Sequence, residues 1–330
     1  MKTRLIALQL FSVFLSAAFS PAYAQSTNMD KELGQKGARM IDSVMGVYTH
    51  PLTTPYIEDV GQRLAGSIYE ALFDYNFRIV DMQQPNAFAL PAGHIYISRG
   101  LLCLLNTEDE LAGILGHEIM HSELRHSVKQ MRQRILPALI QIPGAIVGSV
   151  VNESLGQMIN APLNTGSQLL LASYSRKHEK QADKNGTRLM AASGYDPIQF
   201  PVILDRLSAL VQAMTGKKEE FTYFDSHPYT PKRVSYLDKE IYELTPDIKP
   251  GIASDHESFI RLMDGIYAGA NPAQGIFQEE SFLHPGINIF IRFPEGWLTE
   301  NRPTMAGSMD TTDNQSLVVL SLSARDEMPG

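Results

Sequence analysis

The sequence is poor in features that would identify several other classes of protein. Its 330 residues include one cysteine, Cys103, so an intramolecular disulfide cannot form. A formal net charge of −8 argues against nucleic-acid binding, because phosphate contacts rely on clustered lysine and arginine. Internal repeats, low-complexity tracts and a glycine-rich phosphate loop do not stand out. The fold must therefore depend on its core, and a 44% hydrophobic composition is ample for one.

The first residues have the pattern of a secretory signal peptide. Met1–Arg4 is positively charged, Leu5–Phe19 is apolar, and Ala22–Ala24 forms a small-x-small cleavage site before Gln25. The apolar stretch is shorter than the roughly 20 residues that a membrane-spanning helix needs. The residue directly after the cleavage site is Gln25 and not a cysteine that could carry a lipid, which argues against a lipid-anchored form. We therefore expect residues 1–24 to be removed and the mature chain to be exported.

Residues His117–His121 read HEIMH, a pattern in which one helix presents two metal-binding imidazoles and a carboxylate. An α-helix has about 3.6 residues per turn, so His117 and His121 share a face and can bind one ion. Glu118 then points towards the open coordination position of that ion. Because so short a motif also occurs by chance on ordinary helices, its surroundings decide.

The residues before the motif predict the start of a helix. Thr107 and Glu110 form a capping box, in which the threonine accepts a backbone N–H and the glutamate reaches back. Leu111, Ile114 and Leu115 then follow three- and four-residue spacing, which gives one largely apolar face. Histidine and glutamate on a buried face are costly unless something satisfies them, and a zinc ion would do so.

A catalytic zinc site needs a third protein ligand. His126 would fit the metzincin pattern HExxHxxGxxH, but the register fails, since Leu124 stands where that pattern has glycine and Ser127 where it has histidine. Glu179 is the other candidate, and it lies in a second predicted helix over residues 169–192.

Two neighbours of Glu179 in that helix have different expected roles. Asp183 is four residues further on and shares its face, so we expect it to accept the free ring N–H of a ligand histidine, His117. His178 is turned by about 100° around the helix and is expected to face solvent. Gly194 is expected to cap the helix at its C-terminus.

Three motifs together resemble a known family. They are Gly116 followed by HEIMH, the pattern Ser175-Arg176-x-x-Glu179-x-x-x-Asp183, and the segment Asn86–Tyr96, which reads NAFALPAGHIY. The chain is similar over residues 28–245 to the gluzincin metallopeptidases that include the CAAX prenyl protease and HtpX-type enzymes, and most of all to their soluble periplasmic BepA-like members. The resemblance implies a zinc endopeptidase with a zincin-like fold.

The expected chemistry follows from the motif residues. One Zn²⁺ per chain, held by His117, His121 and Glu179, activates a water, and Glu118 takes its proton as it attacks the scissile carbonyl. Glu118 then protonates the leaving amine.

The resemblance also gives His227 and Arg233 a role, as a pair that stabilises the tetrahedral oxyanion. Donors in such positions are worth about 2.7–4 kcal/mol in other enzymes. The same stretch has an ordinary structural interpretation, because Thr230 and Pro231 are typical of a helix start. His227 could instead occupy the fourth coordination position of the metal in a resting state and hold the enzyme latent.

Asn86, Ala87 and Phe88 precede an apolar run that predicts a strand, a turn at residues 91–93 and a second strand. In related zinc proteases a strand beside the cleft binds extended substrate by β-augmentation, and Asn86 and Ala87 would then offer carbonyls to it. The alternative is an ordinary hairpin.

Residues 135–151 are strongly apolar but contain two prolines and two glycines. A buried helical hairpin, a lid over the cleft, and a surface for peripheral contact with membranes or unfolded clients are all open. The prolines break any continuous span, which favours burial or a lid.

The remaining patterns give the architecture. We predict an α+β fold, with a mainly helical zincin-like metalloprotease domain over residues 25–248 and a small sheet within 77–98. Residues 249–330 should form a linker and a β-rich accessory region that ends early, with strands near 287–293 and 315–323. Helices are expected over 28–48, over 54–70 with Thr54 as cap, and from Asp196-Pro197 to about Leu210. Four leucines around Cys103 predict a buried thiol.

Two functions remain. The first is a periplasmic endopeptidase that degrades misfolded or misassembled envelope proteins, including those of the outer membrane, with the outer-membrane assembly machinery as a further expected partner and nucleic acid excluded. The second is a chaperone-like assembly factor that keeps the zinc fold and cleaves little. An intact Glu118 favours the enzyme, because a binding protein does not need a general base.

Overall fold

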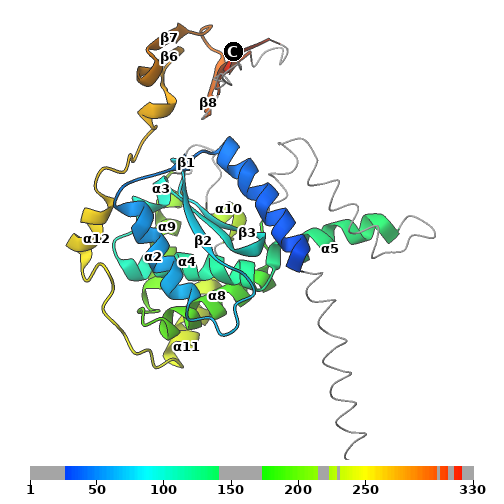
Figure 1. Ribbon diagram of the computed structural model, residues 1–330, viewed down its shortest axis with the longest axis vertical. Helices are drawn as coiled ribbons and strands as arrows, with labels where there is room; N and C mark the ends of the chain where they lie inside the picture. The colour runs from blue at the N-terminus through cyan, green and yellow to red at the C-terminus, as the bar shows by residue number, and fades with distance from the viewer. Residues whose placement is uncertain are drawn as a thin grey trace, which may run out of the picture.

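A computed structural model describes residues 27–140, 173–214, 223–228, 231–302, 305–310 and 316–321 of the protein. The predicted signal peptide lies outside these residues, as does the part of the apolar segment 135–151 that follows Ile140. The described chain is an α+β fold whose helical part precedes a β-rich region, which confirms the predicted fold class (Figure 1).

A four-stranded sheet lies at the centre of the helical part. Its strands are β1 (Val47–Tyr48), β2 (Asn76–Val80), β3 (Ala87–Leu90) and β4 (His94–Ser98), in the order β1-β2-β4-β3. β2 and β4 are parallel, and the other pairs are antiparallel. The turn between β3 and β4 is a 3₁₀ segment, Pro91–Gly93, so the predicted strand, turn and strand are confirmed. β3 is therefore an edge strand.

Both faces of the sheet are covered. Ala87 and Ala89 of β3 belong to the main core with α2 and α4, whereas Phe88 and Leu90 pack under the helix of residues 27–44. Successive side chains of a strand point to opposite faces, so this division follows the twofold period of β3. An uninterrupted apolar sequence is what a strand buried on both sides requires.

Two long helices form the framework of the site. α4 (Glu108–Glu123) begins at Thr107, whose side chain accepts the backbone N–H of Glu110, as predicted. The Glu110 carboxylate does not reach back to Thr107 but accepts the N–H of Asn106 and pairs with Arg206.

α8 (Arg176–Ala192) begins later than the predicted position 169, because Ser175 caps it and residues 173–175 are not helical. Its predicted end is confirmed, with Gly194 in the left-handed region at φ +82°. α8 packs along α4, and the backbones meet at two glycines. A Cβ at Gly186 would lie 3.0 Å from the nitrogen of His117 and 3.1 Å from the carbonyl oxygen of Gly116.

The other helices surround this pair. Within the described residues they are 27–44, α2 (Thr53–Ala65), α3 (Arg99–Leu102), α5 (His126–Ile140), α9 (Gln199–Met214), α10 (Tyr223–Ser226), α11 (Pro231–Tyr242) and α12 (His256–Met263). The cap predicted at Thr54 is wrong, because α2 already starts at Thr53 and the Thr54 hydroxyl accepts the N–H of His50 instead. The predicted burial of Cys103 is also wrong: Leu101, Leu102 and Leu105 take the inward positions and leave Cys103 exposed.

The chain after α11 is fastened to the core before it reaches the accessory strands. The buried carboxylate of Glu108 accepts the backbone N–H groups of Ile252 and Ala253, at 3.1 and 2.6 Å. Arg99 pairs with Asp81 in the interior and donates to the carbonyl of Gly269 at 2.9 Å. The predicted boundary at residue 248 stays a prediction, since this linker runs along the core.

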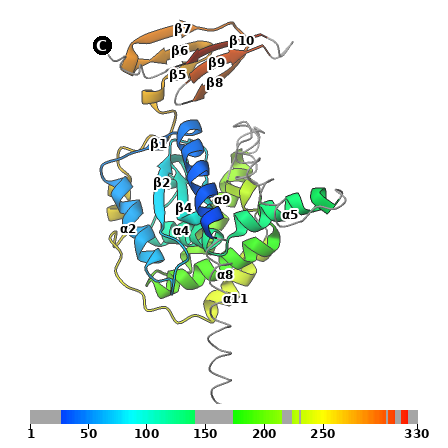
Figure 2. The ribbon, with the colours of Figure 1, turned by 45° about the vertical axis from the view of Figure 1, so that its right-hand side comes forward.

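The accessory region contains two three-stranded antiparallel sheets (Figure 2). One has β5 (Ile276–Gln278), β6 (Ser281–His284) and β7 (Ile289–Arg292), and the other has β8 (Leu298–Arg302), β9 (Met305–Met309) and β10 (Leu317–Ser321). The predicted strands near 287–293 and 315–323 correspond to β7 and β10, and the other four were not predicted. Phe282, Phe293 and Ala306 form its small buried core.

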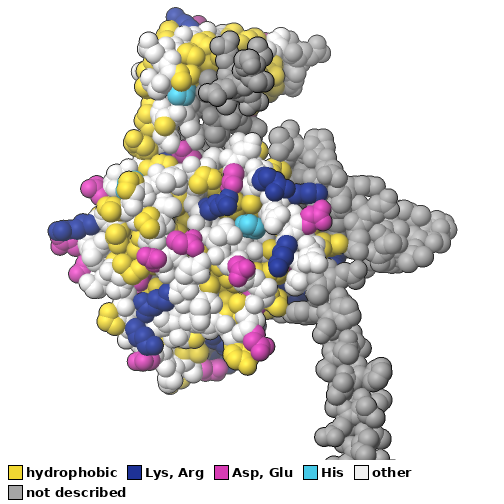
Figure 3. All heavy atoms as spheres, in the orientation of Figure 1, with side chains coloured by type: hydrophobic (Ala, Val, Ile, Leu, Met, Phe, Trp, Pro, Cys, Tyr) yellow, Lys and Arg dark blue, Asp and Glu magenta, His cyan; other side chains and the backbone are white. Residues whose placement is uncertain are grey.

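Within the described residues, no helix is both long and apolar enough to cross a membrane. On the face shown in Figure 3, acidic and basic side chains are interspersed over the core, and apolar side chains recur on the accessory region.

Candidate metal centre

α4 brings the HEIMH residues to the centre of the helical part. The side chains of His117, Glu118 and His121 are completely buried. The Nε2 atoms of the two histidines lie 3.0 Å apart, so both rings converge on one point.

α8 and the residue after α10 complete this group. Glu179 Oε1 lies 3.3 Å from His121 Nε2, and His227 Nδ1 lies 3.2 Å from Glu179 Oε1 and 3.1 Å from His117 Nε2. Together, His117, His121, Glu179 and His227 form a buried cluster in which each residue offers one ligand atom.

The chemistry of this donor set fits zinc. Zinc bonds of about 2.0–2.1 Å in a tetrahedral arrangement separate neighbouring ligand atoms by roughly 3.3–3.4 Å. The four contacts just given span 3.0–3.3 Å, which is close to that spacing. Three imidazole nitrogens that point at one another in a buried place also lack enough N–H donors for their lone pairs, and a cation would satisfy those lone pairs, which are otherwise costly to bury.

Asp183 stands behind His117. Its Oδ1 lies 2.9 Å from His117 Nδ1, on the side of the ring away from the cluster, where it can accept the ring N–H. Burial would raise the pKa of Asp183, but the charge of Arg233 and contact with His117 lower it below the ordinary value. The carboxylate is therefore ionised.

Arg233, on α11, is occupied by this carboxylate. Its Nε and Nη2 donate to Asp183 at 2.8 and 2.7 Å, in a two-pronged pair, and its Nη1 lies 3.3 Å from Glu179 Oε2. Nη1 also donates to the carbonyl oxygen of His227 at 3.2 Å. In this arrangement the guanidinium binds the carboxylates of Glu179 and Asp183 and the backbone carbonyl of His227, and it does not present a free donor to a substrate.

The pKa values of Glu118 and the ligand candidate Glu179 are shifted in opposite directions. Complete burial raises the pKa of Glu118, although His227 and His117 oppose the shift. Burial would also raise the pKa of Glu179, but the charges of His227 and Arg233 lower it well below the usual range. Glu118 thus has the greater proton affinity of the two, as a base requires, and Glu179 stays ionised, as a ligand requires.

His227 links the other three residues of the cluster to Glu118. Its Nε2 is 3.3 Å from Glu118 Oε1, while its Nδ1 faces the other ligand atoms. Burial disfavours the protonated ring, but Glu118 and Glu179 raise the pKa of His227 above its ordinary value. The ring of Tyr223 stacks on His227 at 4.6 Å and fixes its plane.

Two further histidines lie beside the cluster. His178 was predicted to face solvent, and this is wrong: it is 5% exposed and stacks on the ring of His126 at 4.4 Å. His126, set aside as a ligand by its register, is outside the cluster but its Nδ1 lies 3.1 Å from Nδ1 of His121. Burial first, and nearby positive charges second, lower the pKa of His126 to about 3, so the ring is neutral.

Sequence reasoning also missed the aromatic neighbours. Tyr174 stacks on His121 at 3.9 Å, and its hydroxyl bonds to Ser127 at 2.8 Å. Tyr223 covers His227 as described above. No signal in the sequence marks either tyrosine, because each acts through the packing of segments that are far apart in the chain.

The predicted substrate strand needs one correction. The carbonyl of Asn86 accepts the backbone N–H of Ser98 at 2.8 Å and so is used within the sheet. Backbone groups alternate in direction along an antiparallel strand, so those of Ala87 point to the edge of β3 away from β4 and those of Phe88 point to β4. This edge is covered in the structure, because Ala87 and Ala89 are buried and the Ala89 carbonyl accepts hydrogen bonds from the hydroxyls of Tyr174 at 3.4 Å and Ser127 at 3.5 Å. The Asn86 side chain is buried, and neither of its polar atoms has a partner among the described residues.

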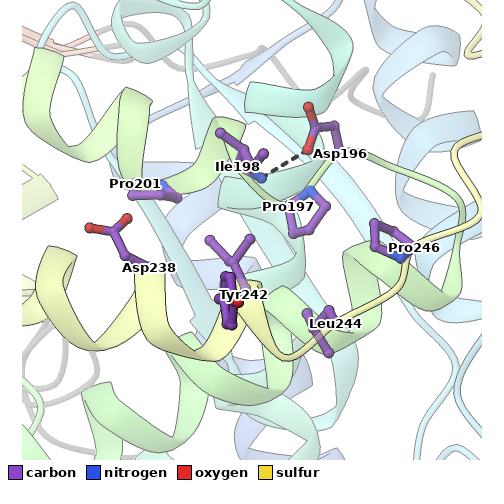
Figure 4. Close-up of a pocket in the computed structure, with 9 residues that line it drawn as sticks. Asp196, Pro197, Ile198, Pro201, Asp238, Tyr242, Leu244 and Pro246 are labelled. Carbon is purple, nitrogen blue, oxygen red and sulfur yellow. Dashed lines mark hydrogen bonds between the residues drawn. The ribbon is translucent and has the colours of Figure 1, made fainter.

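A separate pocket of about 380 Å³ opens on the surface between α9 and α11 (Figure 4). Apolar side chains line it together with Asp196 and Asp238, and the Asp196 carboxylate accepts the N–H of Ile198 at 3.1 Å. None of its lining residues belongs to the metal-binding cluster.

Comparisons with known proteins agree with this geometry. Residues 51–241 match Peptidase family M48. The chain is 26% identical over 224 residues to the beta-barrel assembly-enhancing protease of Yersinia pestis, covering 67% of this chain and 46% of that protein. It is 29% identical over 212 residues to the mitochondrial metalloendopeptidase OMA1 of Schizosaccharomyces pombe, covering 64% and 58%. It is 25% identical over 226 residues to the metalloprotease LoiP of Escherichia coli, covering 66% and 82%. The chain thus spans about half the length of the first two relatives.

Proposed function

The chain belongs to peptidase family M48, and from that premise we propose that it is a zinc-dependent endopeptidase of the bacterial periplasm. The observation that carries this proposal is the position of Glu118, fully buried beside four convergent ligand atoms. Burying a glutamate costs free energy, and a peptidase needs such a residue as its general base. A protein that only binds its clients does not need a general base.

The residues divide the work as follows. His117, His121 and Glu179 would hold zinc, which when bound supplies Lewis-acid chemistry that activates water and polarises the scissile carbonyl. Glu118 takes the proton from the attacking water and delivers it to the leaving amine. The edge of β3 away from β4, beginning with Ala87, would bind the substrate backbone as an added strand.

Asp183 and Arg233 position these groups. Asp183 lies 2.9 Å from His117 Nδ1, where it would accept the ring N–H and fix the tautomer, and Arg233 pairs with both Asp183 and Glu179. We assign Arg233 this positioning role in place of direct contact with the oxyanion. His227 can serve the oxyanion only when its ring leaves the ligand cluster.

His227 therefore suggests a latent resting state. With its Nδ1 among the other ligand atoms, it fills the place that a catalytic site leaves open for water. We propose that substrate binding displaces His227 and opens the site. His227→Ala should then raise zinc-dependent cleavage if latency dominates, whereas a complete loss of cleavage with zinc retained would show that the oxyanion role dominates.

The location and clients follow from other observations. The signal-peptide pattern of residues 1–24 and the resemblance to periplasmic proteases support an exported protein. The names of the relatives, beta-barrel assembly-enhancing protease among them, support misfolded or misassembled outer-membrane proteins as substrates and the machinery that assembles them as a partner.

A second candidate function is client holding with weak proteolysis. The accessory region favours it, because Phe290, Leu298 and Leu317 are 65%, 59% and 63% exposed. The deciding experiment is cleavage of unfolded casein by the exported chain with added zinc and with a chelator. Zinc-dependent fragments support the peptidase, and suppression of casein aggregation without fragments supports the holding function.

A further inference from the structure

Two buried histidines beside the metal cluster have no part in the chemistry described above. His126 is 0% exposed and His178 is 5% exposed, and their rings stack with only 14° between the planes. His126 Nε2 and His178 Nδ1 have no hydrogen-bond partner among the described residues. Burying two imidazoles in this way is costly, so their contacts need an explanation.

The chain makes an unusual turn to bring His126 to this place. α4 ends at Glu123, and Arg125 adopts a left-handed conformation at φ +57°, which is uncommon for a residue other than glycine. Such a conformation costs on the order of 1–3 kcal/mol and persists when surrounding contacts hold it. Here the Arg125 guanidinium forms a two-pronged pair with the buried carboxylate of Asp30, on the N-terminal helix. α5 then starts at His126, with its ring against His121.

Metal binding at His121 determines which ring nitrogen donates in the hydrogen bond between His121 and His126. His121 Nε2 faces the ligand cluster, so it must be free of a proton for a metal to bind there. The ring proton of a neutral His121 is then on Nδ1, 3.1 Å from His126 Nδ1. Two facing ring nitrogens form a hydrogen bond only when one donates and the other accepts. His121 therefore donates and His126 accepts.

We infer that His126 is a positioning residue that orients His121 and fixes its tautomer, as Asp183 does for His117. This inference rests on the metal site of the proposed function, and it assigns to the second ligand histidine the partner that sequence reasoning left open. The two ligands differ in the charge of their partners, since one has a carboxylate and the other a neutral imidazole. His178 supports the plane of His126 by stacking and is not expected to contact the metal.

Three variants of the full exported chain separate the hydrogen bond from the packing. His126→Phe keeps a ring against His178 and removes the acceptor, and His126→Asn keeps an acceptor near the Nδ1 position and removes the ring. His178→Phe is the matched control, because it keeps the stack and removes only nitrogens. Removing a partner of a metal-bound histidine typically weakens metal binding by about 10–100-fold.

The readout is zinc affinity by chelator competition, together with the visible absorption spectrum of the cobalt-substituted proteins. We expect His126→Phe to bind zinc about 10–100-fold more weakly, with a shifted cobalt spectrum, and His126→Asn and His178→Phe to stay near wild type. Wild-type zinc affinity in folded His126→Phe would overturn the inference. Equal weakening in His126→Asn and His126→Phe would also overturn it, because it would indicate packing alone.

A measurement on the zinc-loaded wild type keeps the inference testable should a variant fail to fold. Long-range ¹⁵N–¹H correlation spectra distinguish the two neutral tautomers of each histidine. We expect the proton of His121 on Nδ1 and that of His126 on Nε2, and a proton on His126 Nδ1 would contradict the assignment. Neither readout depends on cleavage, so a protein without protease activity could still confirm His126, and an active protease could still refute it.

Discussion

The metal centre and the accessory β region bury different kinds of residue. In the centre, His117, Glu118, His121 and His227 are completely inaccessible to solvent. In the accessory region, Phe282, Phe293 and Ala306 form a small core, while large apolar side chains of β7, β8 and β10 remain exposed. Costly burial of polar groups thus marks the candidate metal centre, whereas the exposed apolar surface of the accessory region is what the second proposed function, client holding, would use.

The largest expected effect would come from the base in the centre. Glu118→Gln should lower casein cleavage by about 10²–10⁴-fold, because proton transfer is lost while the ligands stay. Zinc content, measured on the purified variant, should equal that of wild type. Glu257→Gln on the surface of α12 is the control and should change neither value. Casein cleavage by Glu118→Gln at the wild-type rate would show that Glu118 is not the base, and the metal centre would then no longer differ from the accessory region as the place of chemistry.

Breaking the buried ion pairs is expected to affect stability more than any surface change. Arg233→Met leaves Asp183 and Glu179 without their cation, and such a change costs about 3–5 kcal/mol when a buried pair is broken. Urea unfolding of the metal-free proteins measures this cost. Arg261→Met, on an arginine whose side chain is 77% exposed, should change the free energy of unfolding by less than about 0.5 kcal/mol. Equal effects of the two substitutions would contradict the proposed role of Arg233.

A smaller effect should appear in the pH dependence of the metal-free protein. The pKa of His227 is raised in the folded state, so its protonated form stabilises folding fully below the ordinary value of about 6.5. That contribution is lost as pH rises through the raised pKa. The difference in melting temperature between wild type and His227→Asn should therefore be largest below about pH 6.5, with wild type the more stable, and should shrink at higher pH. A difference that grows with pH would have the wrong sign.

The smallest effect on the centre should come from the accessory core. Phe282→Ala removes a fully buried aromatic ring and should cost the accessory region about 3–5 kcal/mol. Zinc affinity and cleavage of a short peptide should not change, because the apolar partners of Phe282 among the described residues belong to the accessory region. Phe290→Ala, at an exposed position, is the paired control for stability. Loss of zinc binding in Phe282→Ala would show that the two regions fold as one unit.

The parts of the molecule that sequence could predict are those set by local patterns. Thr107 and the HEIMH spacing act within α4, and Gly194 acts at the end of α8. The start of α4 and the end of α8 therefore follow from neighbouring residues. The family was identified from three such patterns. The start of α8 was misplaced because Ser175 caps it within a stretch of otherwise acceptable helix formers.

The remaining features depend on contacts between distant segments. His178 is buried because the left-handed turn at Arg125 directs His126 towards it, and the sequence gives no sign of that turn. The occupation of Arg233 by Asp183 requires α11 to lie against α8, which only the tertiary fold provides. Cys103 is exposed although four leucines surround it, because the one-turn helix α3 and the residues after it turn Leu101, Leu102 and Leu105 towards the core and Cys103 away from it.

The glycine contact between α4 and α8 has a thermodynamic consequence. His117 and His121 belong to one helix and Glu179 to the other, and the backbones touch where Gly186 meets Gly116. A zinc ion bound across this contact joins the two helices, so releasing the ion and separating the helices become coupled events. The folded chain would gain stability as RT ln(1 + [Zn²⁺]/Kd). The lifetime of the folded chain would then follow the supply of free zinc, and zinc starvation would remove the protein along with its activity.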